Sequence, residues 1–177
     1  RDNSNIMCTL ATKYVNDKLL SFDANKKVRI RFSLMPQELS DILEPNTSKI
    51  IDRIKAVNEF YEAGYDVHLN FSPIIINPSS KELYTQLFKD VDKYIHRSIK
   101  KDVYAECIML THNEKMHEYN LVNDKEAEEI LWQPNRQAKK ISSYGSENLR
   151  YRVDLKQKYI KAFKQLHNKF LNWNTIR

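Results

Sequence analysis

The sequence predicts an α/β protein built on a parallel sheet, and three consecutive segments carry that prediction. Residues 28–34 alternate apolar and polar side chains as a strand does, and residues 67–71 resume an extended pattern. Between them, residues 50–63 place apolar side chains at helical spacing on one face. A strand, a helix and a second strand in this order return to a parallel neighbour through a right-handed crossover.

The elements before residue 50 follow from similar patterns. Residues 6–15 are apolar and β-branched enough for a buried strand, and a short helix at 16–22 follows. After the strand at 28–34, Pro36 opposes continuation of the strand, and residues 35–47 show no obvious element. A connection of that length in a compact domain is more often functional than idle.

Local signals also mark the helix boundaries. Thr47 or Ser48 suits the N-cap of the helix at 50–63, and Gly64 suits the left-handed position that follows it. A second helix begins near Ser80 and ends at 100–102. A strand follows at 103–110.

After residue 110 the sequence predicts a short helix, a hairpin or loop, and a final helix. A short helix ends near Trp132, with Glu126, Glu128 and Glu129 on its solvated face. Residues 133–151 form a loop or hairpin, and a final helix occupies 154–173. His167 is expected to lie on a face of that helix rather than to act as a catalyst.

Composition excludes several classes of site. The only glycines, Gly64 and Gly145, cannot form a glycine-rich phosphate loop. Cys8 and Cys107 are far apart, so the sequence predicts no disulfide scaffold and no zinc or iron–sulfur site made by this chain alone. This cysteine usage favours a reducing cytoplasm. Apolar runs are too short to span a bilayer, and Arg1 opens no signal-peptide pattern, so we expect no membrane contact. We also expect a monomer.

Charge is distributed unevenly along the 177 residues. From residue 133 to the end, 11 Lys or Arg oppose 2 Asp or Glu, a balance of +9, whereas the preceding residues carry 18 against 21, a balance of −3. Cations that alternate with aromatic rings suit single-stranded or flipped nucleic acid, because cations meet phosphates while rings stack on bases. The same pattern is equally compatible with an ordinary soluble hairpin. The basic and aromatic candidates are Lys139, Lys140, Tyr144, Arg150, Tyr151 and Arg152.

Four polar residues each allow two interpretations. Lys13 near a strand end is most simply a lysine whose stem packs while its ammonium reaches water. Ser33 on a strand is most simply a minor hydroxyl. His112 and His117 are five residues apart, which is not the spacing that places two imidazoles on one helical face, so we expect loop or pocket residues and no metal site.

The order of several motifs resembles the carboxyl-terminal half of the spore photoproduct lyase family. They are Thr12-Lys13-Tyr14, Arg29 to Ser33, Glu44-Pro-Asn-Thr-Ser48, Ala63-Gly-Tyr65, Ser72-Pro73 and Tyr144-Gly145. The similarity covers most of the chain. The combination of Glu-Pro-x-Thr-Ser with Ala-Gly-Tyr is specific, whereas each piece alone is weak.

The resemblance implies a radical S-adenosylmethionine (SAM) enzyme. It implies a partial (β/α) barrel, here residues 1–132 without the first units, with a basic hairpin and helix at 133–177. In that family a four-iron four-sulfur cluster on Cys-x-x-x-Cys-x-x-Cys cleaves SAM, and the 5′-deoxyadenosyl radical repairs a thymine dimer in DNA. This chain lacks that cysteine motif, so the cluster would be bound by residues absent from it.

The resemblance also implies roles for individual residues. Lys13 matches a strand-end lysine near the SAM carboxylate, Ser33 a strand serine that contacts SAM, and Ser72 a small residue against the adenosyl group. Tyr144 matches a hairpin tyrosine near the damaged dinucleotide. Ser143 stands where the lyase proper has arginine, so a related radical SAM enzyme with another substrate is an alternative.

Three functional hypotheses follow. The first is the distal fragment of a spore photoproduct lyase-like enzyme, inactive by itself and without catalytic residues of its own. The absence of an initiator methionine is in keeping with a fragment. The second is a non-catalytic nucleic-acid-binding module that uses the basic tail. The third is a (β/α) scaffold for an acidic protein partner.

Overall fold

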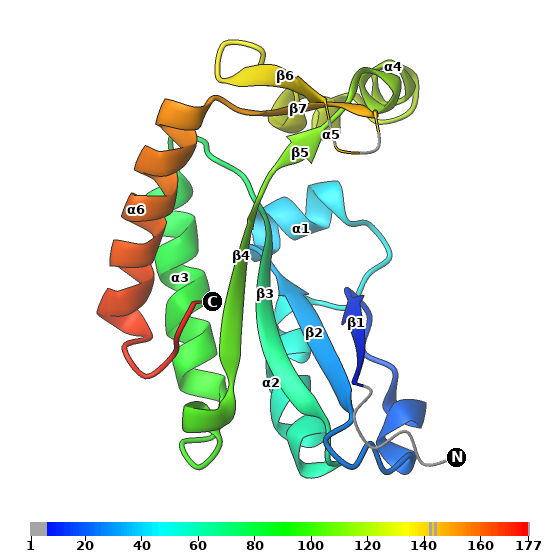
Figure 1. Cartoon of the computed structure of the whole chain (residues 1–177), viewed down its shortest axis with the longest axis vertical. Coiled ribbons are helices and arrows are strands. Elements are labelled where there is room, and N and C mark those ends of the chain that lie inside the picture. The colour runs from blue at the N-terminus through cyan, green and yellow to red at the C-terminus, as the bar shows by residue number, and fades with distance from the viewer. Residues whose placement is uncertain (1–6, 142, 144, 177) are drawn as a thin grey trace.

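A four-stranded parallel sheet forms the body of the protein. The computed structural model describes residues 7–176 apart from 142 and 144. The strands lie in the order β1-β2-β3-β4, and every neighbouring pair is parallel. Figure 1 shows α2 behind this sheet, and α3 and α6 side by side along its β4 edge. The strands are β1 (Cys8–Thr12), β2 (Val28–Leu34), β3 (Asp66–Ile74) and β4 (Tyr104–Met109).

Helices and a small antiparallel sheet complete the fold. The helices are α1 (Gln37–Leu43), α2 (Ile50–Glu62), α3 (Ser80–Tyr94), α4 (Glu114–Asn123), α5 (Lys125–Leu131) and α6 (Val153–Phe170), with 3₁₀ turns at Asp17–Ser21 and Lys100–Asp102. The antiparallel sheet has the order β5-β7-β6, with β5 (Thr111–His112), β6 (Gln137–Ile141) and β7 (Glu147–Tyr151). Together with α4 and α5 it forms the upper lobe in Figure 1.

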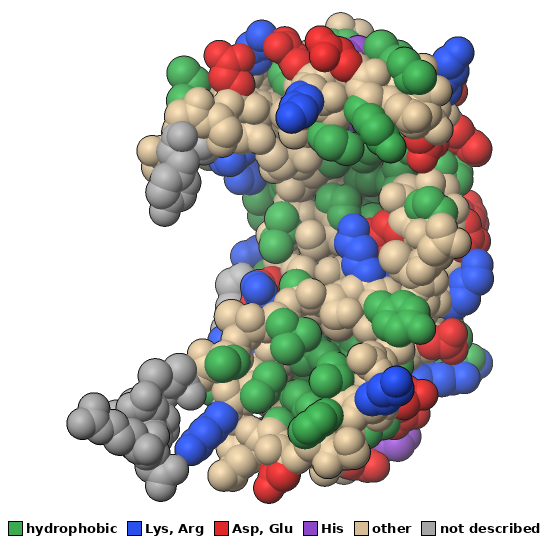
Figure 2. Space-filling view, turned by 90° about the vertical axis from the view of Figure 1, so that its right-hand side faces the viewer, with side chains coloured by type: hydrophobic (Ala, Val, Ile, Leu, Met, Phe, Trp, Pro, Cys, Tyr) green, Lys and Arg blue, Asp and Glu red, His purple; other side chains and the backbone are tan. Residues whose placement is uncertain are grey.

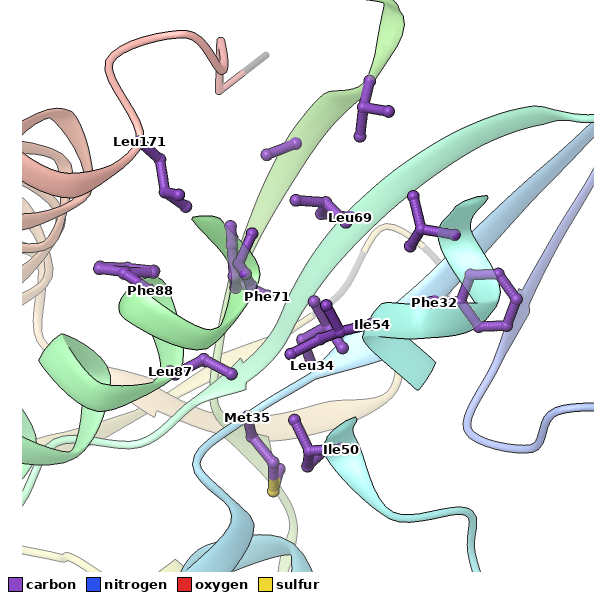
Figure 3. Close-up of a cluster of buried hydrophobic side chains, with 14 of the residues drawn as sticks. Phe32, Leu34, Met35, Ile50, Ile54, Leu69, Phe71, Leu87, Phe88 and Leu171 are labelled. Atoms are coloured by element: carbon purple, nitrogen blue, oxygen red, sulfur yellow. The ribbon is translucent and has the colours of Figure 1, made fainter. Parts of the chain in front are cut away.

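The hydrophobic core lies between the parallel sheet and its helices. Phe32 on β2 and Leu69 and Phe71 on β3 are fully buried, and Figure 3 shows Leu69 and Phe71 in the same cluster as Phe88 of α3. The rings of Phe71 and Phe88 meet edge to face at 5.3 Å between centroids. Burying a side chain of this size contributes about 1.5–3 kcal/mol to stability. Because these apolar residues alternate along the strands, they all lie on one face of the sheet, and that face packs against the helices.

Two predicted features near α2 are confirmed, and two others in the same region are wrong. The strand at 28–34 is correct, and Gly64 has a φ of 86° directly after α2, as the left-handed position requires. The segment expected to lack an element contains α1. The N-cap of α2 is Lys49 without a side-chain cap, and the Gln37 side chain of α1 instead accepts a hydrogen bond from the Ile50 N–H at 2.7 Å.

Other boundaries moved by a few residues. The first strand is shorter than expected, the helix at 16–22 is a 3₁₀ turn, and α3 ends at Tyr94 because the chain turns at Ile95 before the second 3₁₀ turn. His167 is completely buried in α6, with its ring 5.5 Å from that of Phe88. Within the described part of the chain, no helix combines the length and apolar character that a membrane span requires.

Candidate functional site

The face of the parallel sheet opposite α2 is polar. Ser33 on β2 is the register partner of Asn70 on β3, and Asn70 is the partner of Glu106 on β4. These residues alternate with the core residues, so their side chains point away from α2 and α3. Figure 2 shows the molecule hollowed on this side, between the upper lobe and the body of the sheet, with Lys and Arg side chains near the rim. The floor of the hollow therefore carries polar groups from three adjacent strands.

Ion pairs order the floor of this hollow. Arg29 Nε lies 2.7 Å from Asp66 Oδ2, and Arg31 Nη1 lies 3.0 Å from Glu106 Oε2. His68 lies between the two pairs, with Nε2 3.3 Å from Asp66 and Nδ1 3.7 Å from Glu106. Its side chain is only 2% exposed. The sheet thus presents fixed charges of both signs on a half-buried surface.

A buried arginine organises the carboxyl end of β2. Arg53 of α2 is fully buried, and its Nε donates to the Ser48 carbonyl oxygen at 2.8 Å. Its Nη1 donates to the Ser33 carbonyl oxygen and to Glu44 Oε2, both at 2.9 Å, and its Nη2 donates to Thr47 Oγ1 at 2.6 Å. One guanidinium therefore joins the strand end, the Glu-Pro-Asn-Thr-Ser motif and the helix.

The same motif anchors the segment that leaves β1. Lys13 Nζ lies 2.8 Å from Glu44 Oε1, so the Glu44 carboxylate bridges Lys13 and Arg53. Ser48 Oγ accepts the Val15 N–H at 2.9 Å, and the Ser48 N–H donates to the Lys13 carbonyl oxygen at 3.1 Å. The Lys13 side chain is 46% exposed, whereas that of Glu44 is 2% exposed. The ammonium, with three N–H donors, therefore stands at the rim above a buried carboxylate.

The three predicted SAM-binding residues lie at the carboxyl ends of three adjacent strands. Lys13 follows β1, Ser33 ends the polar row of β2, and Ser72 lies two residues beyond Asn70 on β3. Ser33 Oγ accepts from Asn70 Nδ2 at 3.4 Å. Asn70 Oδ1 is buried and accepts no hydrogen bond from any residue that the structure describes. An acceptor without a partner is costly in a folded protein, which makes this atom suited to a ligand donor.

The predicted basic residues divide between the two faces of the hairpin. Lys140 is paired with Asn148 and Arg150 with Ala138, and these two pairs lie on one face of the hairpin. Lys139 is paired with Leu149 on the other face. Lys139 Nζ lies 2.6 Å from Glu114 Oε1 and 3.9 Å from Glu147 Oε2. The ion pair with Glu114 raises the pKa of Lys139. Arg152 is exposed just after β7.

Two aromatic predictions have different outcomes. Tyr144 lies outside the described residues. Tyr151 is 3% exposed, its Oη accepts the Ile76 N–H at 3.0 Å, and burial raises its pKa. The expectation that Tyr151 stacks on a base is therefore corrected, because its ring belongs to the core.

A comparison with known families decides the class of the protein. Residues 3–177 match the family model described as spore photoproduct lyase. The chain belongs to the spore photoproduct lyase family. Two relatives in this family are the spore photoproduct lyases of Bacillus subtilis (strain 168), 33% identical over 92 residues, and of Geobacillus sp. (strain Y412MC61), 30% identical over 98 residues. Those regions cover 52% and 55% of this chain but 27% and 29% of the relatives.

Solved structures of the spore photoproduct lyase family have the same fold. A double mutant with bound AdoMet (SAM) and dinucleoside spore photoproduct matches with a TM-score of 0.85 at 20% identity. A spore photoproduct lyase complexed with dinucleoside spore photoproduct matches with a TM-score of 0.82 at 21% identity. Both matches cover 96% of this chain and 50% of the other chain. The chain thus spans about half the length of the structures it matches.

The cysteines of this family member do not fit an iron–sulfur cluster. Cys8 is exposed on β1 and Cys107 is half-buried on β4, the two outer strands of the sheet. Burial raises the pKa of the Cys107 thiol to about 11, which disfavours the thiolate that a cluster needs. Two separated thiols cannot replace a three-cysteine motif.

Sequence reasoning missed Arg53 and Asn70. Arg53 falls on the apolar stripe of its helix, next to Ile50 and Ile54, and a charged residue in such a stripe is a signal for a buried partner. Asn70 shares the polar side of its strand with His68 and Ser72, and a buried amide there signals a specific hydrogen bond. Ser33, which both side chains contact, is 20 positions from Arg53 and 37 positions from Asn70.

Proposed function

We propose that this chain forms the distal part of a partial (β/α) barrel in a radical SAM enzyme of the spore photoproduct lyase type. The observation that carries the proposal is the polar, open face of the parallel sheet, with Lys13, Ser33 and Ser72 at its carboxyl edge. Ligands of parallel α/β sheets bind at that edge. The likeness to a structure that holds AdoMet and a dinucleoside lesion supports the same position for the cofactor.

The residues at this edge fit the polar groups of SAM. The Lys13 ammonium suits the SAM carboxylate, and the buried Asn70 Oδ1 and Ser33 Oγ offer acceptors. When bound beside a reduced iron–sulfur cluster, SAM supplies a 5′-deoxyadenosyl radical. The residues of this chain bind SAM at the strand edge that the hydrogen bonds of Arg53 hold in place. They also line the space from which water is excluded.

The cluster would come from residues outside this chain. Because its two cysteines do not fit a cluster, the chain alone binds SAM weakly and does not cleave it. The substrate proposed for the complete enzyme is a thymine dimer lesion in DNA, and Ser143 beside the hairpin tyrosine allows a different lesion.

The test is made on the polypeptide that the gene encodes in full. After anaerobic reconstitution with iron and sulfide, we expect cluster absorbance and release of 5′-deoxyadenosine from SAM under reduction. Replacing Ser33 by Val or Asn70 by Leu should weaken SAM binding at least tenfold while leaving the cluster absorbance unchanged. The proposal would be rejected if the protein showed full cluster absorbance but released no 5′-deoxyadenosine.

A second candidate, DNA binding by this chain alone, is favoured by the hairpin. Lys140 and Arg150 share one face of the hairpin, near the exposed Arg152. Neutralising all three should weaken binding to a single-stranded oligonucleotide and lower the slope of log K against log salt by about 2, since each phosphate contact on a single strand contributes about 0.7. Lys139→Ala, on the opposite face, is the matched control. An unchanged slope in the triple variant would exclude this surface.

A further inference from the structure

Two histidines and a glutamate from three different elements converge in the upper lobe. His112 lies on β5, His117 in the first half of α4 and Glu128 on α5. His112 Nε2 lies 2.9 Å from Glu128 Oε1, and His117 Nδ1 contacts the same oxygen. One ligand atom from each residue lies within 4.8 Å of the other two. The earlier expectation that Glu128 faces solvent is wrong, since Glu128 is 3% exposed.

The surroundings hold these three groups in place. Asn120 Nδ2 donates to Glu128 Oε2 at 2.7 Å, which fixes the carboxylate plane. Trp132 stacks on the His117 ring, with 3.6 Å between centroids and 11° between planes, and it also meets the His112 ring edge to face at 6.0 Å. The carboxylate and the two imidazoles are therefore held in fixed orientations toward one another.

Helix α4 lacks an apolar inner face, which gives this cluster a structural task. Its only buried residue is Asn120, and His117 is half-buried, while its remaining residues are exposed. The apolar side chains Met116, Tyr119 and Val122 are at least 44% exposed. Packing of an apolar stripe normally supplies most of the stability of a helix in a protein. Among the described residues, α4 instead turns an imidazole and an amide toward Glu128.

We propose that His112, His117 and Glu128 form a binding site for a first-row transition-metal dication, with Zn²⁺ as the best fit. Two imidazoles and one carboxylate are ligands that Zn²⁺ takes in proteins, at about 2.0–2.2 Å each. The ion replaces the hydrogen atoms that the ring nitrogens now share with the carboxylate, and each ring carries its hydrogen on the other nitrogen. Asn120 and Trp132 become the outer groups that orient the ligands.

The geometry also gives the ion an entry path and a role. The His117 side chain is 21% exposed, whereas those of His112 and Glu128 are 6% and 3% exposed, so one side of the site opens to solvent. Three protein ligands leave one coordination position for water on that side. Because the ligands come from β5, α4 and α5, bound metal joins all three elements. Metal binding thereby stabilises the upper lobe against local unfolding.

The test uses Zn²⁺ alone with the metal-free chain. Isothermal titration calorimetry should give one equivalent bound, and thermal unfolding followed by circular dichroism should move to higher temperature with Zn²⁺ and return after addition of EDTA. Asn120→Ala should weaken binding by about 10–100-fold, the usual effect of removing an outer partner, and His117→Gln should weaken it further. His96→Gln, which removes an exposed histidine outside the cluster, should bind as the wild type does.

Two outcomes would overturn the proposal. The first is no saturable binding of Zn²⁺ to the wild-type chain, a measurement that depends on no variant. The second is equal binding by His117→Gln and the wild type. The visible absorption of Co²⁺ in place of Zn²⁺ gives an independent signal, because nitrogen and oxygen ligands in tetrahedral geometry produce a spectrum that free Co²⁺ lacks.

Discussion

The bridge from Lys13 through Glu44 to Arg53 allows the sharpest prediction about stability. Glu44→Gln keeps the size of the side chain but removes its charge. Arg53, which is fully buried, then has no counter-ion within 4 Å among the described residues. Leaving a buried charge without its partner costs about 3–5 kcal/mol. The new amide retains one hydrogen bond to the guanidinium, so we expect the lower end of that range.

The assay is urea unfolding at pH 7, followed by far-ultraviolet circular dichroism. An unchanged m-value confirms that the midpoint reports stability rather than compactness. Asp41→Asn is the matched control, because its partner Lys49 lies 2.6 Å away but both side chains are at least 50% exposed. Exposed ion pairs contribute little. If Glu44→Gln lowers the free energy of unfolding no more than Asp41→Asn does, the buried Arg53 charge does not depend on Glu44, and the reasoning is refuted.

Three further predictions concern individual side chains. At pH 8 a thiol reagent should modify exposed Cys8 quickly and Cys107 slowly, because burial raises the Cys107 pKa to about 11, and equal rates would contradict this. Burial lowers the pKa of His167, so below about pH 6.5 the unfolded state binds more protons than the folded state. The free energy of unfolding should therefore decrease as the pH falls. In urea unfolding, His167→Gln should show a weaker dependence of this free energy on pH. Tyr151→Phe should cost about 1 kcal/mol by removing the acceptor of the partly buried Ile76 N–H, whereas Tyr14→Phe, at an exposed position, should be neutral.

Sequence reasoning succeeded where one segment carries its own signal. The strand at 28–34 and the left-handed Gly64 depend on local alternation and on backbone freedom, so both could be predicted. It failed at α1, which has no strong apolar period and whose Gln37 caps α2 by a contact across 13 positions. The predicted SAM edge came from motif order, and its chemistry stays a prediction.

The sequence by itself determined the α/β class, the polar and apolar faces of the central strands, and membership of the spore photoproduct lyase family, because these follow from periodicity and ordered motifs. Only the tertiary structure decided which polar groups meet. Arg53 and Glu44, or His117 and Glu128, are 9 and 11 positions apart and join different elements. Such contacts depend on how helices and strands pack, which no local pattern encodes.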